Sequence, residues 1–193
     1  MTEISSRRAI LRSQTARRHA ALERVVGPMT SASAYARYVL GLHAFRAPVE
    51  AALGACDWDG YGFGPWRPTP IAAALQQDLA DLGLRPLSSP SVPAILSAPT
   101  LSGRDGALGI LYVLEGSSLG ARLIYRDALK LGFSAQRGAR HLEAQARGLE
   151  TWRGFLALLD AAQDLDLTEA VLAANATFEV ARLSFLNVDQ HVS

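Results

Sequence analysis

The fold is decided by residues 107–124, which read ALGILYVLEGSSLGARLI. This run is almost entirely apolar and predicts a buried helix, although Gly116 and Gly120 lie inside it. A glycine in a helix interior costs about 1 kcal/mol relative to alanine. Because residues four apart share one helix face, that face carries no side chain at two successive turns. The bare face predicts close approach by another helix or by a flat, bulky ligand.

Helical spacing of apolar residues continues on both sides of this run, and we find no convincing alternating strand pattern. The sequence predicts helices from Ser5 or Ser6 to Gly27, from Ser31 or Ser33 to about residue 53, from Pro70 to about 82, over 104–131, over 139–162 and from Asp166 to about 187. Pro48 predicts a bend or restart in the second helix. Residues 54–68 and 85–103 are rich in residues that favour loops. The expected fold class is all-α.

Length and composition indicate one domain covering residues 1–193. A hydrophobic content of 49% excludes disorder, and a net charge of +1 gives no electrostatic case for nucleic acid. Residues 107–124 are interrupted by Glu115 and closely bracketed by arginine, so we expect no membrane span. The N-terminus lacks an apolar signal core, and Cys56 is the sole cysteine, which suits a reducing cytoplasm.

His19 lies on the apolar stripe of the predicted first helix. A lone histidine in such a place is more often a hydrogen-bonded core residue. However, imidazole is also the usual protein ligand of heme iron, and burial favours its neutral, metal-binding form. His43 lies beside the stripe of the second helix, and we expect His141 and His191 at the surface.

Arginine gathers on the predicted first helix. Residues 7–24 contain Arg7, Arg8, Arg12, Arg17, Arg18 and Arg24 against Glu23 as the one acidic residue. This pattern is typical of a solvated basic face, and it also suits a binding site for carboxylates or phosphates. A neutral imidazole, a bare backbone face and nearby basic groups together suit a planar iron porphyrin with two carboxylates.

Two motifs resemble those of the heme oxygenase family, in its bacterial, biliverdin-producing branch. The first, LRxxTxxxHxxLE over residues 11–23, is similar to the family's first helix, whose histidine is the proximal iron ligand. The second, LYVLEGSSLG over residues 111–120, resembles the distal helix of that branch. Residues 152–156 and 176–178 are similar to later helices, with looser matches. The first two motifs are specific in combination.

The resemblance implies a heme oxygenase-like helical bundle that binds heme between the first and fourth helices. It implies that His19 holds the iron. Gly116 and Gly120 would let the distal backbone lie close to the iron, leaving room for O2 and little else, so that the porphyrin becomes the target of the chemistry.

The same resemblance assigns the edges of the heme pocket. Arg12 would bind a propionate, and Arg153 would correspond to a second basic group on a later helix. Charge-assisted contacts of this kind orient the ring. Phe178 would form a wall of the pocket.

Ser117 is a departure from part of the family, because some members place an aspartate there that organises waters for proton delivery. Serine is common in this stretch of the bacterial branch, so activity is not excluded. We expect backbone groups near Gly116 and Ser117, with ordered water, to deliver protons. Glu115 is less suited, because helical geometry turns it about 100° from Gly116.

The implied function is oxidative cleavage of heme to biliverdin, CO and Fe²⁺, with heme as substrate and cofactor. O2 is the second substrate. Electrons would come from an external donor such as a ferredoxin or a reductase, because the chain shows no flavin, nucleotide or iron–sulfur motif.

Two alternatives remain. Ser117 keeps open a heme carrier or sensor that does not degrade heme. The same architecture also suits a heme-free enzyme resembling the thiaminase group, or a helical interaction module. A thiaminase-like reaction needs a cysteine nucleophile, and only Cys56 is available, without a base motif beside it.

Overall fold

The computed structural model describes residues 6–87 and 103–192. In these ranges the regular structure is helical, and extended pairing is limited to isolated bridges at Ser134, which confirms the all-α prediction. In chain order the helices are α1 (Arg7–Val26), α2 (Ala32–Leu53), α3 (Ala72–Asp81), α5 (Arg104–Gly116), α6 (Ser118–Lys130), α7 (Arg140–Arg147), α8 (Leu149–Ala161) and α9 (Leu167–Val192).

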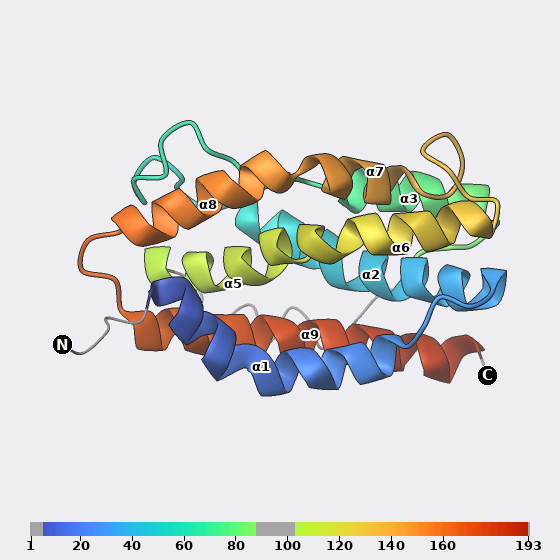
Figure 1. Ribbon diagram of the computed structural model, residues 1–193, viewed down its shortest axis with the longest axis horizontal. Helices are drawn as coiled ribbons and strands as arrows, with labels where there is room; N and C mark the ends of the chain where they lie inside the picture. The colour runs from blue at the N-terminus through green and yellow to red at the C-terminus, as the bar shows by residue number, and fades with distance from the viewer. Residues whose placement is uncertain (1–5, 88–102, 193) are drawn as a thin grey trace.

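The long C-terminal helix α9 is the element on which the others assemble. It packs against α1, α2 and α5, while α6 packs on α7 and α3 packs on α2 and α7. Figure 1 shows α1 and α9 along one long side of the molecule and α8, α7 and α3 along the opposite side, with α2 and α5 between them. The start of α1 and the end of α9 lie toward opposite ends of the long axis (Figure 1).

The predicted helix starts are confirmed where a side chain caps the backbone. The hydroxyls of Ser6 and Ser31 accept hydrogen bonds from backbone N–H groups one turn into α1 and α2. The carboxylate of Asp166 accepts from Thr168 and Glu169 at the start of α9. These caps satisfy donors that the first turn of a helix leaves unpaired.

The third helix, predicted to start at Pro70, begins within two residues of that position, and a distant side chain caps it. The Glu50 carboxylate of α2 accepts hydrogen bonds from the backbone N–H groups of Ile71 and Ala72, and α3 begins at Ala72. Pro48 does not restart α2, which continues through it between the buried residues Phe45 and Val49.

Two predicted helices are each divided. The helix expected over 104–131 breaks at Ser117 into α5 and α6, and the helix expected over 139–162 breaks at Gly148 into α7 and α8. By length and composition alone the stretch Arg104–Lys130 could cross a membrane, but 56% of its most apolar window is buried inside the protein. Burial of this kind is expected of a core helix.

One core cluster joins all the helices. Its fully buried members include Leu11, Tyr35, Val49, Leu75, Leu79, Leu108, Leu111, Leu142, Phe155, Leu159 and Val188. Close approach of α5 to α9 depends on Gly109, because a Cβ there would lie 2.1 Å from the carbonyl oxygen of Ala170. At this position the absent side chain makes room for another helix.

His141 is buried, so the prediction that it lies at the surface was wrong. Its Nδ1 donates to the Asp78 carboxylate at 2.8 Å, and its backbone N–H donates to the same oxygen at 3.0 Å. Burial lowers the pKa of His141. Burial alone would raise the pKa of Asp78, but these hydrogen bonds lower it overall. His191 was also expected at the surface, and its side chain lies outside the described residues.

We expect Gly109→Ala to destabilise the protein by about 1–3 kcal/mol, because the methyl group forces α5 away from α9. Thermal unfolding of the heme-free protein measures the effect. An unchanged unfolding midpoint would contradict the close α5–α9 contact.

We expect the protein to lose stability as the pH falls below about 6.5, the ordinary pKa of histidine. Because the folded-state pKa of His141 is lowered, the unfolded chain takes up the proton first, and this linkage favours unfolding in acid. Unfolding midpoints between pH 7.5 and 5, compared with those of His141→Gln, would test this. The variant should be less stable at neutral pH and should depend less steeply on pH.

Candidate functional site

His19 lies on α1 one turn after the buried Thr15. Its side chain is 56% exposed, so the expectation of a buried imidazole was wrong. At the N-terminal end of α1, Arg7 and Arg8 contact α8. Further along, α1 rests on α9, and the ring of His19 meets the buried ring of Phe178 edge-on at 5.5 Å.

The surroundings of His19 suit a metal ligand. Its Nδ1 lies 3.5 Å from the Glu23 carboxylate one turn later. A carboxylate at one ring nitrogen fixes the tautomer and leaves the other nitrogen to bind metal. Among the described residues no group of three or more His, Cys, Asp or Glu is placed to hold a metal ion.

The glycine face of α5 and α6 is open where the motif predicts it. A Cβ on Gly120 would meet nothing within 4 Å, and a Cβ on Gly116 would meet only the Trp152 ring, at 3.7 Å. Leu119 and Leu123 flank this face and are about half exposed, at 50% and 56%. Bare backbone beside exposed leucine is a surface that a flat apolar ligand can cover.

Trp152 of α8 lies between Gly116 and the first turn of α1. Its ring contacts the Gly116 position on one side, and the Arg8 guanidinium of α1 lies 5.7 Å from its centre. Tyr112, one turn before Gly116, packs against Trp152 with ring centres 6.1 Å apart. Burial raises the pKa of Tyr112, while the Thr15 hydroxyl and the charges of nearby arginines on α1 oppose that rise.

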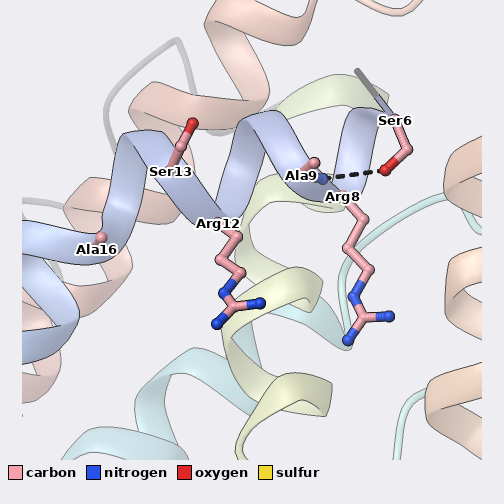
Figure 2. Close-up of a pocket in the computed structure, with 6 residues that line it drawn as sticks. All are labelled: Ser6, Arg8, Ala9, Arg12, Ser13 and Ala16. Carbon is pink, nitrogen blue, oxygen red and sulfur yellow. Dashed lines mark hydrogen bonds between the residues drawn. The ribbon is translucent and has the colours of Figure 1, made fainter. Parts of the chain in front are cut away.

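Arg12 and Arg8 extend from α1 in the same direction and line a surface depression of about 400 Å³ (Figure 2). A second depression of about 430 Å³ is lined by Arg17, Arg18, Ala21 and Arg24. Both depressions lie along α1, and neither includes His19 or the distal glycines. Residues of the two motifs contact each other where the Thr15 side chain meets Tyr112.

The sequence also singled out Arg153, Ser117 and Glu115. Arg153 is exposed on α8, whereas its neighbour Trp152 is buried and lies beside Arg8 of α1. The Ser117 hydroxyl donates to the carbonyl of Leu114 at 2.6 Å. Glu115 is buried, and its carboxylate accepts the Thr69 N–H at 2.8 Å.

Sequence reasoning missed several residues that build this site. Tyr112 is spaced four residues before Gly116, as Gly116 is before Gly120, so helical periodicity could have placed it on the same face. Arg46 and Glu50 are an opposite-charge pair at the same spacing within α2. Nothing local in the sequence indicated that Arg8 would lie over Trp152.

Comparisons with known proteins agree on one family. Heme oxygenase PigA of Pseudomonas aeruginosa is 36% identical over 105 residues, which make up 54% of this chain. The matched part spans about half of that curated relative, 51% of its length. No protein-family model matches the chain.

The fold is similar to that of a solved heme oxygenase. The NO- and CO-bound heme oxygenase of Neisseria meningitidis superimposes with a TM-score of 0.74 at 25% sequence identity. The similarity covers 95% of this chain and 92% of the other. The chain therefore has the all-α heme oxygenase fold, as the motifs predicted.

We expect Gly120→Ala to weaken hemin binding without harming the fold. Its methyl group meets no protein atom and improves helix propensity by about 1 kcal/mol, so the unfolding midpoint should hold or rise. The same methyl would occupy space needed by a ligand against the backbone. Hemin titration followed by absorption, with unfolding of the heme-free variant as control, measures both effects. Unchanged hemin affinity would show that the ligand lies elsewhere.

Proposed function

We propose that this chain, for which sequence and fold both support the heme oxygenase family, cleaves heme oxidatively to biliverdin, CO and Fe²⁺. The observation that carries the proposal is the open glycine face, where a side chain at Gly120 would meet nothing within 4 Å. That face is linked through Trp152 to the helix that carries His19. An iron macrocycle between an imidazole and bare backbone accounts for both features.

His19 would hold the iron through Nε2. Its Nδ1, beside the Glu23 carboxylate, keeps the proton and orients the ring. Phe178 supports the imidazole edge-on and limits its rotation. Bound heme supplies the iron that activates O2, and its porphyrin is the substrate that is opened.

Gly116 and Gly120 would set the space on the opposite face. Without side chains they let the helix backbone approach the ring, so that O2 fits and larger ligands do not. Leu119 and Leu123 would cover part of the ring and exclude water from it.

Arg12 is proposed to bind a propionate. It extends beside Arg8, and an arginine fork binds a carboxylate through two parallel hydrogen bonds. Arg153 is proposed as the second basic group. Its exposed side chain would bind the other propionate at the rim of the site.

Proton delivery is proposed to run through ordered water held by backbone groups near Gly116 and Ser117. The Ser117 hydroxyl already donates its proton to Leu114, and the Glu115 carboxylate is bound to Thr69. Neither side chain therefore has a proton directed to the site.

Electrons are proposed to come from a separate donor protein, such as a ferredoxin or a reductase. We place the reaction in the cytoplasm, where the single thiol of Cys56 stays reduced. Neither nucleic acid nor a membrane is proposed as a partner.

The decisive assay adds hemin and a reducing system to the purified protein in air. We expect the heme absorption band to decay while biliverdin, followed by its absorption, and CO form in equal molar amounts. A persistent oxygenated heme spectrum would instead identify a carrier or sensor. Failure to bind hemin would favour the heme-free alternatives.

His19→Ala should abolish turnover and remove the imidazole signature from the spectrum of the hemin complex, because the iron loses its protein ligand. Exogenous imidazole added to the variant should restore part of that signature. His43→Ala serves as the control. A fully active His19→Ala enzyme would place the iron ligand elsewhere, with His43 as the first candidate.

A further inference from the structure

Ser117 lies at a break in the helix that carries the distal glycines. α5 ends at Gly116 and α6 begins at Ser118. Carbonyls beside this break receive side-chain donors: Ser117 Oγ donates to Leu114 and Ser118 Oγ donates to Glu115, both at 2.6 Å. The Ser117 hydroxyl thus uses its one proton within the chain, and its lone pairs remain to accept.

Three different elements hold the residues of this break. From α2, Arg46 Nη1 donates to the Leu114 carbonyl at 3.3 Å. From the segment before α3, the Thr69 N–H donates to the Glu115 carboxylate at 2.8 Å. From α7, Gln145 Nε2 donates to Ser117 Oγ at 2.9 Å. Of these three contacts, the one from Gln145 of α7 is made to Ser117, which lies between Gly116 and Gly120.

Gln145 lies on α7, a helix whose position is held by contacts with α3. It is only 4% exposed, and it lies one turn after His141, whose ring and backbone are bound to Asp78 of α3. At the end of α7, a Cβ on Gly148 would meet Ser118 Cβ at 3.8 Å. The α7 helix is therefore anchored at one end by α3 and lies close to the break at the other.

A movement of Ser117 would be passed on to the glycine face. The Ser117 carbonyl accepts the backbone N–H of Gly120 at 3.2 Å. The amide of Gln145, the hydroxyl and carbonyl of Ser117, and the N–H of Gly120 thus form a continuous connection. It runs from a buried side chain on α7 to the open backbone of α6.

We propose that Gln145 is a positioning residue for the distal face. Its amide fixes the Ser117 hydroxyl, and through it the backbone of Gly120, at one distance from the bound heme. The inference rests on the proposed function. Gln145 touches neither heme nor O2, and it acts only through Ser117.

The test compares Gln145→Met, which keeps the length of the side chain and cannot donate, with the natural protein as ferrous–CO heme complexes. The infrared C–O stretching band reports how uniform the surroundings of the ligand are. We expect a broader or split band in the variant, because the break then samples more than one arrangement. We also expect heme opening to slow by about three- to tenfold, the kinetic equivalent of one net hydrogen bond, with hemin affinity nearly unchanged.

The Ser117→Ala variant shows whether Gln145 acts by positioning the Ser117 hydroxyl or only by packing. If Gln145 acts through the hydroxyl, then adding Gln145→Met to Ser117→Ala leaves the band and the rate as they are in Ser117→Ala alone. In the heme-free protein, Gln145→Met alone should lower the unfolding midpoint by about 2–4 °C, and the Ser117→Ala background should remove most of that fall. Gln77→Met, at an exposed glutamine on α3, is the matched control and should change neither band nor rate.

The outcomes distinguish this inference from the proposed function. A natural protein that binds and opens heme, with a Gln145→Met variant of unchanged band and rate, would overturn the positioning role alone. Equal effects of Gln145→Met with and without the Ser117 hydroxyl would also overturn it, by making Gln145 a packing residue. A natural protein that does not bind hemin would overturn both.

Discussion

The buried guanidinium of Arg46 is the constraint on which the arrangement of the site depends. It is 1% exposed and donates to the Glu50 carboxylate, to the carbonyl of Thr69 and to the carbonyl of Leu114. A charge this deeply buried is tolerated only when its donors are satisfied. Its partners lie in α2, in the segment before α3 and in α5, so these three parts of the chain are held in one relative position.

Glu50 extends the same constraint. Its carboxylate binds Arg46 and also caps the first N–H groups of α3. α3 then carries Asp78, which holds the start of α7 through His141. The path from one ion pair in α2 therefore leads through two helices to Gln145, and from there to the break at Ser117. Polar contacts, each of modest net energy, decide where the glycine face lies.

Two glycines along α5 and α6 have different surroundings. Gly109 is needed because the backbone of α9 occupies the place of its side chain. At Gly120 no protein atom occupies that place. The sequence pattern left open whether the bare backbone at Gly116 and Gly120 faces a helix or a ligand. Gly120 lies within the motif that resembles the distal helix of the heme oxygenase family, and we propose that a ligand covers it.

The all-α fold class and most helix starts could be predicted from the sequence, because they depend on local effects. Caps such as Ser6, Ser31 and Asp166 act within one turn, and apolar spacing acts within one helix. The exposure of His19, the burial of His141 and the break at Ser117 could not be predicted. The surroundings of these residues depend on elements distant in the chain: His19 meets Phe178 of α9, α3 binds His141, and α7 binds Ser117. Local chemistry thus determined which helices form, and long-range packing alone decided which of their faces remain open to a ligand.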